Sequence, residues 1–311
     1  ILAQGEYRPE AYSAVGVSLR AMPRATQPGG RLALAVLLYC LATRLCRWRA
    51  ALPFAGVMSA AEGRLKGVKR GAEGEARPTL TYWNGRGLCE QVRFMLAACG
   101  VDYDESVPGF DGVTHLSEKA HMDHLRSEGY LMFNQVPLLR MDGLNLVQSR
   151  AIVRYLASKH GLAGSTPAQT AMCDVVAESI QDWKSGCGAA FEFCGAYTPD
   201  PGQQEGIRRA HAKYLPLLER LAAASTTGFL MGSHGCDGMT YPDVLLLEGL
   251  EQASSRDDGF LQGFPALAAL HERLRESPRM KAFLASDLRK SKDRSPAAIE
   301  AYKQAVISTL S

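Results

Sequence analysis

A short apolar run, a glycine-rich turn and a helical apolar pattern follow one another in the first half of the chain. Leu80 to Trp83 are β-prone and suit a short strand on a partly buried surface. Asn84-Gly85 and Gly87 interrupt the run, because glycine adopts positive φ at little cost. Apolar residues then recur at helical spacing and end in a glycine: Val92, Met95, Leu96, Cys99 and Gly100. The segment predicts a strand, a turn and a helix whose N-terminus faces the end of the strand, where an anionic group is favoured.

The next segments extend this unit into a mixed α/β pattern. Residues 101–107 are β-compatible, and residues 109–128 are polar, as in a helix or a loop. The polar stretch holds three histidines without a strong metal-ligand pattern: His115, His121 and His124. The spacing of the last two favours a solvated helix face over a metal site.

A hairpin is predicted by two strand patterns, residues 136–141 and 144–147, around Asp142-Gly143. Pro137 cannot donate to a strand ladder, so it indicates either an edge strand or a cis peptide bond.

A helical pattern follows Ser149 and ends at Gly161, and Ser149 is its expected N-cap. The N–H groups at such a helix start, with Gln148 in front, form a receptor for a carboxylate. A cap without any ligand is an equally good interpretation of these residues.

The chain from residue 168 onward reads as helices with short breaks. Thr240 and Asp243 form a capping-box pattern, and residues 244–250 behind them are apolar nearly all round, which indicates a buried helix. The tail, residues 296–310, has the pattern of an amphipathic helix, with a frayed terminus as the alternative. We therefore predict an α/β plus all-α chain. Residues 78–161 would form a thioredoxin-like domain, and residues 165–311 an all-helical C-terminal domain.

Charge separates the front of the chain from the rest. The chain has 311 residues and a net charge of +3, with 46% hydrophobic and 22% charged residues, which is ordinary for a soluble protein of two domains. Residues 1–77 hold 12 Lys and Arg against 5 Asp and Glu, or +7, and the remainder holds 23 against 27, or −4. The predicted domains therefore carry no nucleic-acid footprint.

Residues 1–77 have a different character from the predicted domains. Their apolar run, residues 32–42, is shorter than the roughly 20 residues that a membrane span needs. A signal-like segment, an Arg-rich organelle transit peptide and translated sequence upstream of a start at Met58 are the competing interpretations. We favour a basic extension that is disordered or non-native, and expect no stable membrane span.

Eight cysteines are scattered without a C-x-x-C motif or Cys/His ligand spacing. This argues against a disulfide framework and a zinc site. Reduced thiols in a cytoplasmic setting, with no metal, are the expectation.

Tyr82 lies at the end of the first predicted strand, beside the predicted helix N-terminus. A tyrosine hydroxyl aimed at a bound thiol would favour the thiolate, and lowering a thiol pKa by about 2 units needs about 2.7 kcal/mol. From these residues alone, an ordinary half-buried strand tyrosine is the more favoured interpretation.

Several motifs, which fall in order along the chain, resemble one known family. They are Tyr82-Trp-Asn-Gly-Arg-Gly, Glu90 with Arg93, Gly129-Tyr-Leu-Met-Phe, Gln135-Val-Pro, Asp142-Gly143 and Leu146-Val-Gln-Ser-Arg-Ala-Ile-Val-Arg-Tyr-Leu-Ala-Ser-Lys. Together they look like a cytosolic glutathione transferase of the alpha class, from about residue 78 to the C-terminus. Around residues 109–124 the chain carries a longer loop than the family pattern.

This resemblance implies roles for individual residues. Tyr82 would be the catalytic tyrosine that stabilises the glutathione thiolate, for attack on an apolar electrophile. The residues that would bind glutathione are Arg126, Gln135, Val136, Pro137, Gln148, Ser149, Asp182 and Lys213. Met132 and Phe133 would form the interface of a homodimer, or of a heterodimer with a paralogue. The tail would cover the electrophile site, and the expected activity is detoxifying conjugation in the cytoplasm.

One position departs from the family pattern. The alpha-class pattern usually carries an arginine where this chain has Leu88, and we expect Arg86 to compensate in part. A missing cation near the thiolate puts turnover in doubt more than glutathione binding. A carrier of apolar ligands with weak catalysis is therefore one alternative, and a glutathione-dependent isomerase or peroxidase is another.

Overall fold

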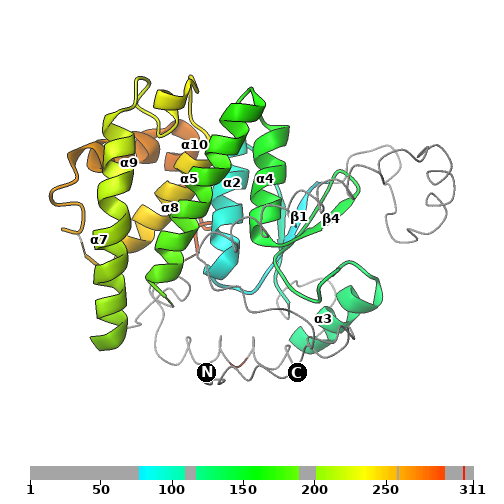
Figure 1. Cartoon of the computed structure of the whole chain (residues 1–311). Helices are drawn as coiled ribbons and strands as arrows, with labels where there is room; N and C mark the ends of the chain where they lie inside the picture. Colours follow the sequence, from blue (N-terminus) through cyan, green and yellow to red (C-terminus); the bar gives the residue numbers. More distant parts are fainter. Residues whose placement is uncertain (1–76, 109–116, 189–200, 258, 291–303, 305–311) are drawn as a thin grey trace, which may run out of the picture. The chain divides into compact units, whose positions relative to one another are not determined.

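The computed structural model describes residues 77–108, 117–188, 201–257, 259–290 and residue 304 (Figure 1). The predicted basic extension lies outside the described residues apart from Arg77, and the predicted tail helix apart from Gln304. The longer loop expected around residues 109–124 is described only from residue 117. The described helices and strands belong to one compact unit, residues 67–311.

The first part of this unit is a small mixed sheet with helices. The strands are β1 (Thr79–Thr81), β2 (Asp104–Ser106), β3 (Leu138–Met141) and β4 (Leu144–Val147). Their order in the sheet is β2-β1-β3-β4. β1 pairs parallel with β2, whereas β3 pairs antiparallel with both β1 and β4. The helices of this part are η1 (Gly87–Cys89), α2 (Glu90–Cys99), α3 (Glu118–Ser127) and α4 (Ser149–Lys159). The predicted thioredoxin-like arrangement is confirmed.

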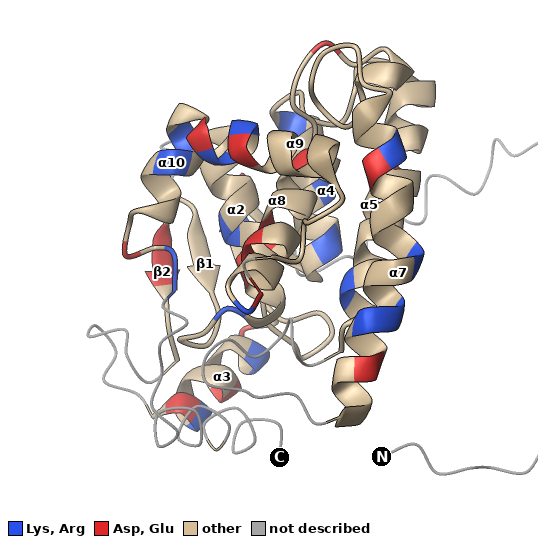
Figure 2. Cartoon of the chain, turned by 90° about the vertical axis from the view of Figure 1, so that its left-hand side faces the viewer, with Lys and Arg blue, Asp and Glu red and all other residues tan. Residues whose placement is uncertain are grey.

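The second part consists of helices. They are α5 (Pro167–Gly186), α7 (Pro201–Ala223), η2 (Gly232–His234), α8 (Tyr241–Ser254), α9 (Pro265–Glu276) and α10 (Pro278–Leu284). α5 packs against α7 and α8, and α7 packs against α9. α2 contacts α4 on one side and α8 and α10 on the other, so it joins the sheet to the helices (Figure 1). Acidic and basic residues are intermixed along α3, α7 and α9 (Figure 2).

The predicted hairpin is confirmed in its turn and its register. Asp142 and Gly143 both have positive φ, 54° and 71°, as a two-residue type I′ turn requires. The Val136–Pro137 peptide bond is cis, which was one of the two predicted alternatives. The other alternative, an edge strand, is wrong because β3 lies between β1 and β4.

The predicted capping box of α8 is also confirmed. Asp243 accepts from the backbone N–H of Thr240 at 2.8 Å, and the Thr240 side chain accepts from the first turn. Asp243 additionally accepts from the N–H of Leu230 at 2.6 Å, so the box ties the helix to the preceding loop. Residues 244–250 are all buried, as the apolar pattern predicted.

Three local predictions are wrong. The first strand was expected to reach Trp83, but β1 ends at Thr81. Ser149 is the first residue of α4 rather than its N-cap, a position held by Gln148 at φ 70°. The reason is tertiary, since the Ser149 hydroxyl accepts a hydrogen bond from Gln91 of α2 instead. His121 is buried rather than on a solvated face, with its Nε2 3.5 Å from Ser106 Oγ, whereas His124 is exposed as expected.

The described residues show neither a metal-ligand cluster nor a membrane-spanning helix. No cluster of three or more His, Cys, Asp and Glu side chains there is arranged to hold a metal ion. Among the same residues, no helix combines the length and the apolar character needed to cross a membrane.

Candidate functional site

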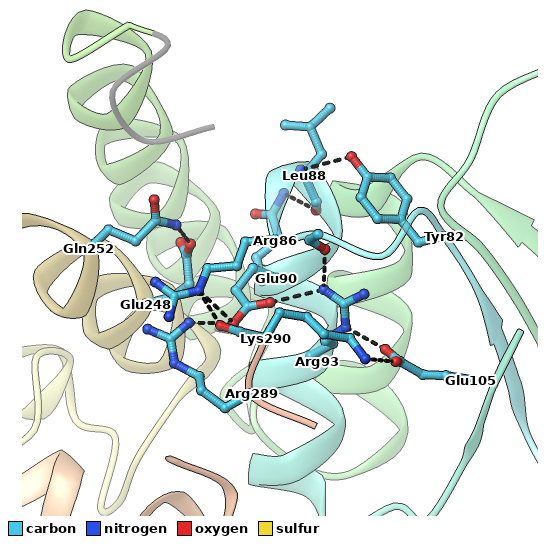
Figure 3. Close-up of polar contacts among 12 residues, drawn as sticks. Tyr82, Arg86, Leu88, Glu90, Arg93, Glu105, Glu248, Gln252, Arg289 and Lys290 are labelled. Carbon is cyan, nitrogen blue, oxygen red and sulfur yellow. Dashed lines mark hydrogen bonds and ion pairs between the residues drawn. The ribbon is translucent and has the colours of Figure 1, made fainter. Parts of the chain in front are cut away.

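Tyr82 follows β1 directly and its side chain is 9% exposed. The Tyr82 hydroxyl oxygen accepts a hydrogen bond from the backbone N–H of Leu88, with an N···O distance of 3.3 Å (Figure 3). Leu88 lies in η1, which runs straight into α2, so the hydroxyl sits at the N-terminal end of a helix. Hydrogen bonds in series polarise one another, and the bond from Leu88 therefore strengthens Tyr82 as a donor. This is the geometry needed to stabilise a bound anion.

Gly87 permits this close approach. Its φ is +42°, and a Cβ at this position would lie 2.4 Å from the Tyr82 hydroxyl oxygen. The sequence predicted a glycine turn, but only the structure shows that the missing side chain makes room for the tyrosine.

Arg93 of α2 fixes the turn from its buried side. The Arg93 Nη1 donates to the Gly85 carbonyl at 2.8 Å and to Glu90 at 2.9 Å, while Nε donates to Glu105 at 2.5 Å. Burial disfavours the charge of Arg93, but Cys89, Glu90 and Glu105 raise its pKa overall. Sequence reasoning gave Glu90 and Arg93 no role of their own, although two charges three residues apart in an apolar helix are a signal for a buried ion pair.

Arg86 extends away from Tyr82 toward the segment after α10 (Figure 3). Its side chain is 7% exposed, and its Nε donates to the Lys290 carbonyl at 2.7 Å and lies 3.9 Å from Glu90. The expected support of the thiolate by Arg86 stays a prediction. Leu88, at the position where the family pattern has arginine, is 51% exposed.

Ser149 is connected to both parts of the structure through Gln91. The Gln91 side-chain amide donates to Ser149 Oγ at 2.9 Å, and the Gln181 side chain of α5 donates to Gln91 Oε1 at 2.6 Å. All three side chains are buried. The preceding residue, Gln148, is exposed and has positive φ, a strained conformation for a residue other than glycine.

The other residues expected to bind glutathione lie on separate elements. Gln135 is exposed and Val136 half-buried, beside the buried cis Pro137 at the start of β3. Arg126 is on α3, where it pairs with Asp123 at 2.9 Å. Their roles stay predictions.

Asp182 of α5 and Lys213 of α7 are both exposed. Lys213 Nζ donates to Tyr214 at 2.9 Å, and its pKa is raised mainly by that bond and to a smaller degree by Asp182. The two charges therefore lie close enough for Asp182 to stabilise the charged form of Lys213. No described contact joins either residue to Tyr82 or Ser149. Met132 and Phe133, at 76% and 59% exposure, present apolar side chains on the surface.

The described cysteines are buried and carry protonated thiols. Burial raises the pKa of Cys89, Cys99, Cys173 and Cys187 to about 12. A thiol of this kind is a poor nucleophile, so none of the cysteines in the described part of the chain is suited to act as one.

Comparison with known proteins identifies the family of the chain. Residues 78–158 match the family model of the glutathione S-transferase N-terminal domain, and residues 190–287 match that of its C-terminal domain. Glutathione S-transferase alpha-5 of Rattus norvegicus is 33% identical over 67% of this chain and 88% of its own length. Glutathione S-transferase 3 of Gallus gallus is 32% identical over 68% of this chain and 86% of its own length.

Solved structures agree with this assignment. A Nu-class transferase from Haemonchus contortus has a TM-score of 0.55 at 27% identity, covering 67% of this chain and 96% of its own. NaGST-2 has a TM-score of 0.56 at 29% identity, covering 68% and 96%. The resemblance to the alpha class is confirmed by the sequence relatives, of which the Rattus norvegicus protein is an alpha-class transferase. The chain belongs to the glutathione S-transferase family, and it is an enzyme that transfers groups to glutathione.

Proposed function

We propose that Tyr82 ionises the thiol of bound glutathione and that the thiolate attacks an apolar electrophile held next to it. The observation that carries this proposal is the Tyr82 hydroxyl, which accepts the Leu88 N–H at 3.3 Å at the start of the η1–α2 helix. A hydrogen bond to a charged group contributes about 1.5–3 kcal/mol, and a helix N-terminus about 0.3–1 kcal/mol. Together these would lower the pKa of a thiol from about 8.5 to between about 6 and 7.

Glutathione would occupy the edge of the sheet between Tyr82 and α4. The Arg126 side chain and the Gln135–Val136 backbone beside Pro137 would contact the glycyl and cysteinyl parts. Gln148 and Ser149, at the N-terminus of α4, would receive the γ-glutamyl group. The positive φ of Gln148 supports this role, since such strain often occurs at binding sites.

The same proposal places the electrophile beside Leu88. This exposed leucine adds apolar surface where the family pattern has a cation, which favours uncharged electrophiles. The same substitution is the specific observation in favour of the second candidate function, a carrier of apolar ligands with weak catalysis.

Members of this family are generally dimeric. We infer a homodimer in which Met132 and Phe133 insert into an apolar pocket of the second subunit, since both side chains are exposed. Asp182 and Lys213 would then reach the glutathione of the partner. One similar structure, at 26% identity, is titled as a monomeric transferase, Na-GST-3 from Necator americanus, so oligomeric state needs its own test. Sedimentation of wild type and Phe133→Ser tests it: wild type should sediment as a dimer and the variant as a monomer.

Detoxification in the cytoplasm is the physiological setting that this chemistry suits. The direct test of the proposed chemistry is steady-state conjugation of a chloronitrobenzene by wild type and Tyr82→Phe, combined with calorimetric titration of glutathione. We expect kcat/KM to fall about 10- to 100-fold in the variant while glutathione still binds. Equal rates in the two proteins would reject the role of Tyr82. Glutathione binding without turnover in wild type would favour the carrier.

A further inference from the structure

Two carboxylates, buried Glu90 and half-buried Glu105, pair with cations of both the thioredoxin-like part and the segment after α10 (Figure 3). Glu90 is fully buried, and it accepts from Arg93 on one oxygen and from Arg289 on the other. Glu105 is paired with Arg93 at 2.5 Å and with Lys290. Arg93 thus lies between two carboxylates, each of which takes a second cation from residues 289 and 290. The side chains of Arg289 and Lys290 are only 9% and 16% exposed, so water screens these pairs weakly.

These ion pairs orient the Arg93 guanidinium, which fixes the turn after Tyr82 through its bond to the Gly85 carbonyl. The guanidinium of arginine is a rigid planar fork, so the positions of its acceptors set the direction of its remaining donors. With Glu90 and Glu105 in place, Arg93 Nη1 reaches the Gly85 carbonyl at 2.8 Å. A shift of either carboxylate would rotate the fork and release Gly85.

Arg86 is a second cation close to Glu90, so its position depends on whether Arg289 is paired with that carboxylate. Arg86 Nε lies 3.9 Å from the same Glu90 oxygen that Arg289 contacts, and it donates to the Lys290 carbonyl at 2.7 Å instead. Without the charge of Arg289, that oxygen would attract Arg86. Closing this gap would pull on the 86–88 segment, whose Leu88 N–H contacts the Tyr82 hydroxyl.

We propose that Arg289 is a positioning residue for the transfer reaction, which acts by neutralising Glu90 and thereby keeping Arg93 and Arg86 in the places that set the turn after Tyr82. The proposal rests on the role proposed above for Tyr82. It adds a residue from the far end of the chain, 199 positions from Glu90, to the machinery of the thiolate site. Phe94 and Phe283 support it, because Arg289 lies 5.0 Å over the Phe94 ring and the two rings pack edge to face.

The test compares wild type with Arg289→Gln and Arg289→Lys. Lys281→Gln is the matched control, because it removes one positive charge from α10 at an exposed pair with Glu276. The quantity measured is the apparent pKa of the bound glutathione thiol, from the pH profile of kcat/KM for the electrophile at saturating glutathione. For Arg289→Gln we expect the pKa of that thiol to rise by about 1 unit. The thiolate fraction at about pH 7 then falls from about one half to about one tenth, so kcat/KM should fall about fivefold. The lysine variant should lie between it and wild type, and Lys281→Gln should match wild type.

A merely structural role would lower the melting temperature and leave the thiol pKa unchanged, and that result for Arg289→Gln would overturn the proposal. Should Arg289→Gln fail to fold, the lysine variant decides the question, and an unchanged thiol pKa in that variant would overturn it. Tyr82→Phe in the same assay separates the two proposals. If Tyr82→Phe raises the thiol pKa and Arg289→Gln does not, only the role of Arg289 fails. If Tyr82→Phe has no effect, the proposed chemistry fails whatever Arg289 does.

Discussion

Replacing Gly87 with alanine displaces the Tyr82 hydroxyl while leaving the tyrosine itself unmutated. The new Cβ would lie 2.4 Å from the Tyr82 hydroxyl oxygen, whereas real Cβ atoms stay at least 3.0 Å from their neighbours. The hydroxyl or the turn therefore has to move by 0.6 Å or more, the difference between these two distances. Positive φ adds a strain of about 1–2 kcal/mol for alanine. Because a misplacement of about 1 Å can cost about 100-fold in rate, we expect kcat/KM to fall at least about tenfold.

The assay is conjugation of a chloronitrobenzene, with thermal melting measured in parallel. Gly161→Ala is the matched control, since Gly161 has φ +73° and a Cβ there would meet nothing within 4 Å. Both variants should lose about 1–2 kcal/mol of stability, or roughly 2–8 °C, but only Gly87→Ala should lose activity. A folded Gly87→Ala protein with the kcat/KM of wild type would refute the reasoning, because the hydroxyl position would then not matter.

Three further changes have defined outcomes. Leu88→Arg should raise kcat/KM about two- to fivefold, with a gain that shrinks at high salt, because the new cation is half exposed; conjugation rates at two ionic strengths check this. Glu90→Gln leaves Arg93 and Arg289 buried with one carboxylate fewer, so it should cost about 3–5 kcal/mol, measured by denaturant unfolding. Burial lowers the pKa of His211 below 6.5 in the folded protein. As the pH falls, the unfolded chain therefore binds this proton before the folded protein does, and stability falls below pH 6.5. The free energy of unfolding, measured at about pH 7.5 and about pH 5.5, should decrease less in His211→Phe than in wild type.

Each of these predictions has a control. Leu88→Gln should not raise the rate, and an equal gain from glutamine would contradict the electrostatic reason. Glu276→Gln breaks an exposed pair and should change stability by less than about 0.5 kcal/mol. A pH dependence of stability that is identical in His211→Phe and wild type would show that His211 does not carry it.

Local sequence signals predicted the elements that depend on local chemistry. Asp142-Gly143 specifies its hairpin turn because both residues tolerate positive φ, and the capping box of α8 is complete within four residues. The first strand was predicted to include Tyr82 and Trp83, but β1 ends at Thr81. The chain turns there, with the Gly85 N–H bonded to the Trp83 carbonyl at 2.6 Å.

The parts that the sequence could not reveal depend on partners far along the chain. Ser149 fails as a cap because its hydroxyl contacts Gln91, 58 positions earlier. The direction of Arg86 depends on the Lys290 carbonyl, 204 positions away, and no local pattern announces such a pairing. Glutathione-site residues were named through family motifs, since an exposed Gln148 or a half-buried Val136 carries no chemical signal by itself.

The pKa of the thiol of bound glutathione tests the central claim most directly. It is obtained by titrating the ultraviolet absorbance of the thiolate in the complex, for wild type and Tyr82→Phe. We predict a thiol pKa of about 7 in wild type and a rise of about 1–2 units in the variant, the equivalent of one charge-assisted hydrogen bond. A thiol pKa that is the same in both proteins, or that stays near about 8.5 in wild type, would contradict it.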